Sequence, residues 1–527
     1  MYLQQQKSVS SQVCSCPFRS TRTGGASAVR HVTLSGSCSI YHHNGQASGT
    51  TNPKTPHTET PLTALRRTIH AFSALAAIGI GAWMRLLMLK DLPQVNGDTL
   101  LYGNIARNML QHARIAVTDG NGVPHETLIR LPGYPLFLAA CFGIFGIGNF
   151  TAVSYVQIAL ELAGCLLLAD FVRLIAPANI KTAAAQTTLW LAALCPFTAS
   201  YAVAPLTETP TLFSIALALW ALARFHARPR WLTALTFTFA VTFAALLRPD
   251  GALVGITLAP ALILGLRELS AANIRRRVTR MILACFLLAL LPFAIWTARN
   301  WRVFHLFEPL APRYATDPGE ATNPGWQRWM KTWCLDFVST SQVYWNVPGN
   351  EFDVTQLPDR AFDSPSQRAE TEALAADYND NGQDLSSSLD ARFAQLAAQR
   401  IHDHPLRYYL WLPLGRMADM WLRPRVENLN IDSDWWVYSH HYSETRFSWA
   451  YAALNAAYLL LAVAGLCFKP RYAIWMVLYF VLRSALLMTI EAPEARYTLE
   501  CFPMLFALAA IGAVATVRKV ANTFTRS

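Results

Sequence analysis

The feature that most constrains this chain of 527 residues is a series of apolar runs, each about 20 residues long. A helix rises about 1.5 Å per residue, so such a run is long enough to cross the roughly 30 Å hydrocarbon core of a bilayer. The sequence predicts ten spans, at residues 68–90, 153–172, 182–203, 210–227, 231–247, 251–267, 281–297, 446–468, 471–490 and 499–517. We therefore expect an all-α polytopic membrane protein, which excludes a wholly soluble enzyme, a disordered scaffold and a disulfide-stapled secreted module.

Two further apolar stretches, 132–149 and 405–422, are short and are interrupted by proline or arginine. If they spanned the membrane, the number of spans would rise to eleven or twelve. The distribution of basic residues argues against this, because cytoplasmic loops carry an excess of Lys and Arg. With neither stretch spanning and Arg66 and Arg67 inside, the inner loops after the first outer segment hold ten basic residues and the short outer turns hold only Arg248. Both termini are then cytoplasmic, and both stretches are expected to lie at the outer surface.

This topology divides the chain into four parts: a tail (1–65), a transmembrane module (66–297) with a first outer loop (91–152), a mixed extracytoplasmic domain (298–445) and a second transmembrane module (446–527). Residues 1–67 contain seven Lys and Arg residues and one acid, so most of the net charge of +11 belongs to the tail. The tail has no sustained apolar period and is expected to be disordered, as a cytosolic tail or an over-extended start rather than an organellar transit peptide. No nucleic-acid partner is expected.

Unusual carboxylates gather at the expected outer face. Asp98 begins a helical stretch in which Tyr102 lies one turn later on the same face. Asp98 is either the cap of that helix or a general base at the membrane boundary. Glu208, in the turn Thr207-Glu208-Thr209-Pro210, is either a helix-start carboxylate or a second acid of the same site.

Arginines also occur in the segments and turns that are expected at the outer face. Arg130 precedes a rigid turn that contains Tyr134, and it either neutralises a phosphate or extends to the membrane interface. Arg248, Arg299 and the pair Arg496-Tyr497 follow at later outer turns. Arginine can donate two parallel hydrogen bonds to phosphate. Because six chain-distant turns bring carboxylates and arginines to one face, the sequence predicts a single composite site.

Glu161 and Arg483 are charged residues within predicted spans, each in the expected outer half. An intramembrane charge is costly and is normally paired, so we expect these two to pair with each other. No metal is expected, because the histidines lack cysteine partners and helical i,i+4 spacing. The sequence contains no phosphate-cradling glycine loop, and no cofactor is expected.

These residues resemble the GT-C membrane glycosyltransferases of the family 39 type, bacterial relatives of the protein O-mannosyltransferases and of the lipid A aminoarabinose transferase. The likeness runs from about residue 68 to 517. It rests on the order of these motifs: Asp98-x-x-x-Tyr102, Arg130-x-Pro132-Gly133-Tyr134-Pro135, Thr207-Glu208, Leu247-Arg248-Pro249, Arg299-Asn300-Trp301-Arg302 and Arg496-Tyr497.

The resemblance implies a GT-C-type bundle with a surface helix in the first outer loop, in a bacterial cell membrane, and an active site on the extracytoplasmic side. The implied donor is a polyprenyl-phosphate sugar, and the acceptor is a lipid, a glycan or a protein. Asp98 corresponds to the family's base for an inverting displacement. Many relatives have a second acid at the next position, where this chain has Thr99, which leaves Glu208 as the candidate second acid.

Two other functions compete with this interpretation. A surface-glycan polymerase or ligase would also be embedded in the membrane and would also use lipid-linked sugars. A transporter would place its binding residues near the bilayer midplane, often in two related halves. The polar residues of this chain line the outer boundary instead, which disfavours the transporter.

Overall fold

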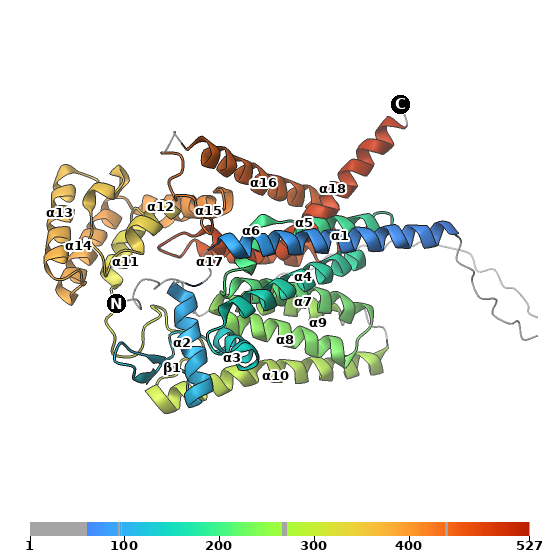
Figure 1. Ribbon diagram of the computed structural model, residues 1–527, viewed down its shortest axis with the longest axis horizontal. Coiled ribbons are helices and arrows are strands. Elements are labelled where there is room, and N and C mark those ends of the chain that lie inside the picture. The colour runs from blue at the N-terminus through green and yellow to red at the C-terminus, as the bar shows by residue number, and fades with distance from the viewer. Residues whose placement is uncertain (1–60, 93–94, 96, 266–270, 438–440, 526–527) are drawn as a thin grey trace, which may run out of the picture. The chain divides into compact units, whose positions relative to one another are not determined.

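The computed structural model describes residues 61–92, 95, 97–265, 271–437 and 441–525. The chain forms two compact units. Of the unit Val13–Ala71, residues 61–71 are described, and they are helical. Apart from residues 61–71, the features described below lie in the unit that contains Phe72–Ser527. The regular secondary structure of the described residues is helical except for one two-stranded hairpin (Figure 1). The all-α expectation is thus confirmed for these residues.

Among the described residues, nine of the ten predicted spans each coincide with one helix. These helices are α1 (Pro61–Asp91), α4 (Phe150–Ile175), α7 (Glu208–Ala227), α8 (Trp231–Leu247), α9 (Ala252–Leu264), α10 (Ala272–Phe304), α16 (Tyr442–Leu466), α17 (Ala473–Leu487) and α18 (Phe502–Phe524). Five helical segments are long and apolar enough to cross a membrane: Leu65–Asp91, Glu208–Ala227, Ala272–Phe304, Tyr442–Leu466 and Ala495–Phe524. The chain is therefore built as a multi-pass membrane protein, while the total of ten spans stays a prediction.

The predicted span 182–203 is not one helix, which corrects the sequence analysis. It is divided into α5 (Lys181–Ala193) and α6 (Pro196–Ala202). Pro196 has no backbone N–H and cannot continue the hydrogen-bond ladder of α5, so the chain restarts with proline in the first turn of α6. The apolar composition of the run concealed this break.

The predicted pairing of Glu161 with Arg483 is also wrong. Glu161 on α4 accepts a hydrogen bond from Arg85 on α1. Arg85 also donates to the carbonyl of Ala193, at 2.7 Å, where α5 ends. A carbonyl freed by a helix break in apolar surroundings needs such a donor. Arg483 has different partners, described with the site.

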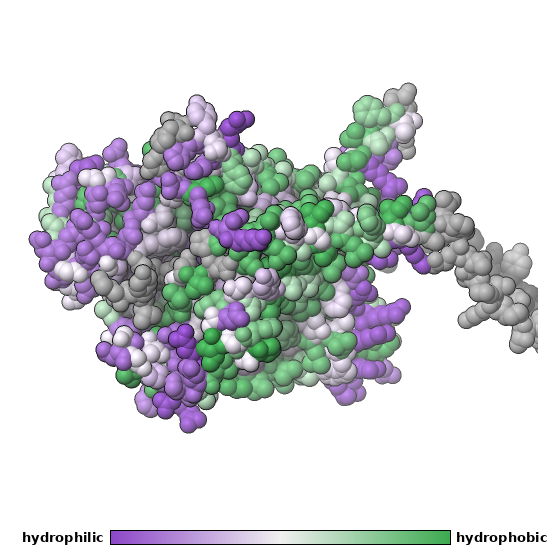
Figure 2. Space-filling model, viewed as in Figure 1, coloured by the Kyte–Doolittle hydropathy of each residue, from purple (hydrophilic) through white to green (hydrophobic). Residues whose placement is uncertain are grey.

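The main core lies where α4, α5, α7, α16 and α18 pack against one another. Its buried side chains are mostly Ala, Leu and Phe, and α18 contributes residues such as Phe502, Leu505 and Leu508. The outward faces of the helices are apolar as well, since Leu75, Phe286 and other large side chains are exposed. Figure 2 shows a hydrophobic band between hydrophilic surfaces on the visible face, as expected for helices that face lipid.

The segment predicted to be the first outer loop (91–152) has a helical frame. It contains α2 (Gly97–His112), the antiparallel strands β1 (Ala116–Thr118) and β2 (Pro124–Glu126), and α3 (Gly133–Phe145). The stretch 132–149 is thus mainly one short helix. A Cβ atom on Gly133 would lie 2.5 Å from the backbone of Leu246, so only glycine lets the start of α3 approach the end of α8 this closely. Arg130, Leu131, Leu247 and Arg248, which flank this approach, all line one cavity.

The segment 298–445 was expected to be mixed in structure, but its described residues contain helices and no strand. The main helices are α11 (Pro324–Lys331), α12 (Phe337–Ser339), α13 (Pro365–Asp380), α14 (Ser387–Asp403) and α15 (Leu412–Leu422). It has its own core around Trp326, Trp329 and Trp333. The predicted tail lies outside the described residues up to residue 60, and its last five residues belong to α1.

Candidate active site

A cavity that opens to solvent lies where several loops and the start of α2 converge. Its polar lining comes from the start of α2, the loop before α3, the turn before α7, the α8–α9 turn and the 3₁₀ turn η7 (Ala495–Cys501) before α18. The lining residues are Asp98, Tyr102, Ile129, Arg130, Leu131, Leu206, Thr207, Glu208, Leu247, Arg248, Pro249, Asp250, Ala311, Pro312, Ala315, Arg496 and Tyr497. The predicted convergence of distant outer turns is therefore present in the fold.

Asp98 lies in the first turn of α2 and contacts Arg130. The Nη2 atom of Arg130 donates to Oδ1 of Asp98 at 2.9 Å, and both side chains keep some exposure to the cavity, 13% for Arg130 and 17% for Asp98. The guanidinium carbon of Arg130 is 5.7 Å from the centre of the Tyr102 ring. Burial raises the pKa of Tyr102 to about 12, so its phenol keeps its proton near neutral pH and can donate a hydrogen bond.

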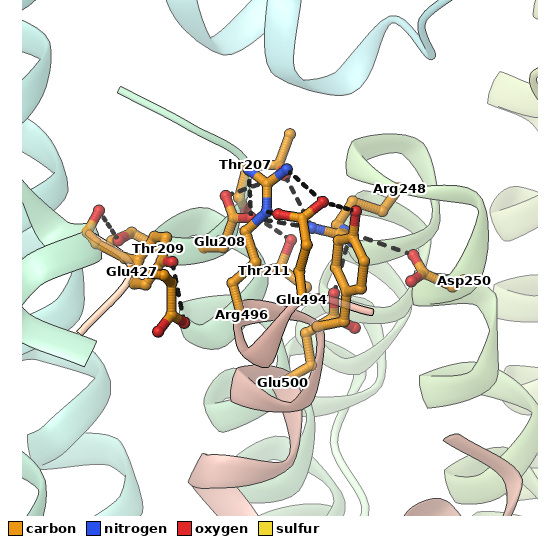
Figure 3. Close-up of polar contacts among 12 residues, drawn as sticks. Thr207, Glu208, Thr209, Thr211, Arg248, Asp250, Glu427, Glu494, Arg496 and Glu500 are labelled. Carbon is orange, nitrogen blue, oxygen red and sulfur yellow. Dashed lines mark hydrogen bonds and ion pairs between the residues drawn. The ribbon is translucent and has the colours of Figure 1, made fainter. Parts of the chain in front are cut away.

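Arg248 is surrounded by three carboxylates. Its Nη1 donates to Oε1 of Glu208 at 3.2 Å, and its Nε lies 3.3 Å from Asp250 and 3.1 Å from Glu500 (Figure 3). Burial alone would lower the pKa of Arg248, but these carboxylates outweigh it and raise the pKa well above its usual range. Arg248 is therefore a permanent cation that already has anionic partners on one side.

The turn η7 contributes Arg496 and Tyr497, and Glu494 directly precedes it. Nε of Arg496 is 2.6 Å from Oε2 of Glu494, and its Nη1 is 3.9 Å from Oε1 of Glu208. The Tyr497 hydroxyl donates to Glu494, and the Tyr497 ring lies between two guanidinium groups, 5.7 Å from that of Arg248 and 5.5 Å from that of Arg496. Glu208 thus contacts both Arg248 and Arg496.

Two fully buried arginines hold η7 from behind the cavity. Arg425 donates to the carbonyl of Ala495 and to the hydroxyl of Thr498, each at 2.6 Å. Arg483 on α17 donates to the carbonyl of Tyr497 at 2.8 and 3.1 Å and contacts the carboxylates of Asp250 and Glu500. These contacts fix the backbone from which Arg496 and Tyr497 project.

Seven of the nine predicted site residues line the cavity: Asp98, Tyr102, Arg130, Glu208, Arg248, Arg496 and Tyr497. Tyr134 is not in the lining; its hydroxyl donates to Gln157 at 3.0 Å, and its ring supports Tyr102 from behind, edge to face, with centres 5.0 Å apart. Arg299 is also outside the lining. It donates to the carbonyls of Thr127 and Ile115 at 2.7 and 2.8 Å and so ties the hairpin to α10.

Three carboxylates of the site were absent from the predicted set: Asp250, Glu494 and Glu500. Asp250 and Glu494 each lie two residues from a predicted arginine, and this spacing was the available signal. Glu500 stands at the start of an apolar run, where a charged residue marks a functional or paired position. All three are buried, with exposed fractions of 4% or less.

The site's carboxylates are directed at arginines rather than at one another. Among the described residues, no group of three or more His, Cys, Asp or Glu side chains has the arrangement to hold a metal ion. In the part of the chain that the structure describes, the polar chemistry of this cavity is therefore that of carboxylates, guanidinium groups, tyrosines and Thr207. Such a set can accept a proton and stabilise an anion.

No family model matches the chain, and no curated protein matches it. Among solved structures, the chain is similar to the Archaeoglobus fulgidus oligosaccharyltransferase tethered to an acceptor peptide with the NVT sequon, with 12% identity, 86% of this chain covered and a TM-score of 0.44. The chain spans half the length of that protein.

The chain is also similar to ArnT from Cupriavidus metallidurans in two structures. For the apo state the identity is 14%, the coverage 86% of this chain and 78% of ArnT, and the TM-score 0.33. For the state bound to undecaprenyl phosphate, the identity is 14%, the coverage 84% and 77%, and the TM-score 0.35.

Proposed function

We propose that this protein is an integral-membrane glycosyltransferase that moves a sugar from a polyprenyl-phosphate donor to a lipid, glycan or protein acceptor on the extracytoplasmic face. The observation that carries the proposal is the cavity itself. It joins a partly exposed carboxylate, Asp98, to two arginines, Arg248 and Arg496, within one open space. Sugar transfer from a lipid phosphate needs both a proton acceptor and cations that hold the leaving phosphate.

Asp98 acts as the base in this scheme. The acceptor hydroxyl gives its proton to the carboxylate as its oxygen attacks the anomeric carbon of the donor sugar. The bond between that carbon and the phosphate oxygen breaks, and the electron pair leaves with the polyprenyl phosphate. Attack from the face opposite the leaving group inverts the configuration at the anomeric carbon. Arg130, 2.9 Å from Asp98, orients the carboxylate.

Arg248 and Arg496 bind the phosphate. Both are held by carboxylates and lie with exposed fractions of 12% at the cavity wall. An incoming phosphate takes the hydrogen-bonding positions that face the cavity, while the carboxylates keep the guanidinium groups oriented. Glu208 contacts both arginines, at 3.2 and 3.9 Å, and is the second acid of the site. The isoprenoid chain lies along the apolar outer faces of the helices.

The test compares the lipid-linked and surface glycans of cells that have the protein with those of cells that lack it. We expect one sugar residue to be missing without the protein, and its identity and position would name both donor and acceptor. Reintroduced wild-type chain should restore it, and reintroduced Asp98→Asn chain should not. Identical glycans in the two kinds of cell would contradict the proposal.

A further inference from the structure

We propose that Arg483, which does not line the cavity, is a positioning residue that sets how strongly the site binds a lipid phosphate, by holding the carboxylates on which Arg248 rests. This inference rests on the proposed function, because it assumes that Arg248 binds phosphate. The inference gives a functional role to an arginine that lies in an apolar helix, where packing alone would not require a charged residue.

The position of Arg483 is unusual for a charged side chain. It lies on α17, is 0% exposed, and projects from a helix that is otherwise apolar apart from Ser484. All its nitrogen atoms have partners: Nε and Nη2 donate to the carbonyl of Tyr497, and Nη1 contacts carboxylates of Asp250 and Glu500, at 2.5 and 2.9 Å. Every one of these partners belongs to a turn that lines or supports the cavity.

Two carboxylates join Arg483 to Arg248, each through its two oxygen atoms. Asp250 directs Oδ2 at Arg483 and Oδ1 at Arg248, 3.3 Å from Nε. Glu500 directs Oε2 at Arg483 and Oε1 at Arg248, 3.1 Å from Nε. Because each carboxylate is held at one oxygen by Arg483, the other oxygen has a fixed position, and Arg248 is fixed with it.

Charge balance gives Arg483 a second effect on the same residue. The connected cluster consists of three arginines and four carboxylates: Arg248, Arg483, Arg496, Glu208, Asp250, Glu494 and Glu500. Without Arg483, Asp250 and Glu500 would both depend on Arg248. Two buried carboxylates drawn onto one guanidinium group would oppose the approach of a phosphate to it.

The chain offers a matched control, Arg85. It is also 0% exposed, lies on an apolar helix, and contacts one carboxylate and two backbone carbonyls. None of these partners lines the cavity. Loss of Arg85 therefore removes a buried membrane arginine and its ion pair without altering the partners of Arg248.

The experiment measures binding of undecaprenyl phosphate to the purified full chain in detergent, together with its thermal unfolding temperature. We compare the wild-type chain with Arg483→Gln, Arg483→Lys and Arg85→Gln. Residues that orient a ligand-binding group are typically worth about 10- to 100-fold in affinity, so Kd should rise roughly tenfold or more for both Arg483 variants. Arg483→Lys keeps the charge but cannot reach both carboxylates and the carbonyl, so it carries the test if the Gln variant does not fold. Arg85→Gln should lower the unfolding temperature and leave Kd within about twofold of wild type.

A double variant, Arg483→Gln with Asp250→Asn, removes one negative charge as well as the positive one. It should bind undecaprenyl phosphate more tightly than Arg483→Gln alone, whereas a purely structural role for Arg483 predicts a further loss. A double variant that binds no better than the single one would overturn the inference. So would an unchanged Kd in both Arg483 variants, or an equal loss in Arg85→Gln. Failure of the wild-type chain to bind would overturn the proposed function and the inference with it, whereas unchanged binding in the Arg483 variants would overturn the inference alone.

Discussion

Arg85 and Arg483 are both fully buried on apolar helices, but their surroundings differ. Arg85 and Glu161 form an isolated pair, because the other contacts of Arg85 are the backbone carbonyls of Gly81, one turn earlier on α1, and of Ala193 at the helix break. Arg483 shares two carboxylates with Arg248, which faces a cavity. A buried charge in a membrane protein is therefore not by itself a sign of function. A functional role is indicated when the partner of the buried charge also contacts a residue that lines a cavity, as Asp250 does for Arg483 and Arg248.

The largest expected effect on sugar transfer is that of a substitution at Asp98, a carboxylate that is partly exposed in the cavity. Asp98→Asn cannot accept a proton, and loss of a general base typically costs about 10²- to 10⁴-fold in rate. Sugar transfer in isolated membranes supplied with a polyprenyl-phosphate sugar should fall by this factor, while the protein still accumulates. Asp119→Asn is the control, because Asp119 lies in the same outer loop and contacts only its own hairpin. Wild-type transfer by Asp98→Asn would remove the assignment of the base.

The Arg85–Glu161 pair should show the opposite behaviour. Glu161→Gln leaves Arg85 as a buried, uncompensated charge, which typically costs about 3–5 kcal/mol of stability. Its unfolding temperature in detergent should fall clearly, while transfer per folded molecule should stay at the wild-type level. Asp170→Asn on the same helix is the control and should cost much less, because the Asp170–Arg224 pair is partly exposed, 28% and 43%. A Glu161→Gln chain as stable as wild type would contradict the contrast between the two clusters.

Arg496→Ala tests an arginine of the cluster that lines the cavity, and its expected effect is smaller. One lost charged hydrogen bond to phosphate corresponds to about a 10- to 100-fold weaker interaction. We expect the KM for the donor to rise by that factor and the KM for the acceptor to change less. Equal changes in both, or no change in donor dependence, would count against phosphate binding by Arg496.

Asp419 on α15 differs from the carboxylates of both clusters, because it is partly buried, with its side chain 17% exposed, and has no close cation. Its nearest cationic atom in an ion pair is on Arg423, 3.8 Å away, and burial raises its pKa from 3.8 to about 6. Because the folded pKa is above the unfolded one, the contribution of Asp419 to stability is greatest below pH 4 and falls as the pH rises to about 6. The expected loss is about 1–3 kcal/mol. The unfolding temperature of Asp419→Asn should gain on that of wild type across this window. A constant difference from pH 4 to 7 would contradict the assignment.

Much of the helical frame could be predicted from apolar run length, because a span must be both long and apolar. The break at Pro196 could not be predicted that way, since an average over the run conceals one proline. The partners of Glu161 and Arg483 were also out of reach. Charge and depth along a helix limit which residues lie at one level, but the neighbour of each helix depends on packing throughout the bundle.

The site was more accessible to prediction than the pairing of the spans. Its residues lie in turns on one side, so the predicted topology alone brought Asp98, Arg248 and Arg496 to one level. Arg299 satisfied the same criterion and yet holds the hairpin, because a turn's level does not determine the direction of its side chain. Glu500 was overlooked because it lies inside a run that was interpreted as a span.

The turn η7 has a consequence for motion. It is held by Arg425 and Arg483 and continues into α18, whose side chains are largely buried in the main core. Local opening of such a segment requires nearly global unfolding, so its backbone amides should exchange with deuterium very slowly. The hairpin tip around Gly120 and Gly122 is exposed and should exchange quickly. The cavity wall that carries Arg496 and Tyr497 is therefore rigid, and under the proposed function little ordering entropy remains to be lost when the donor binds.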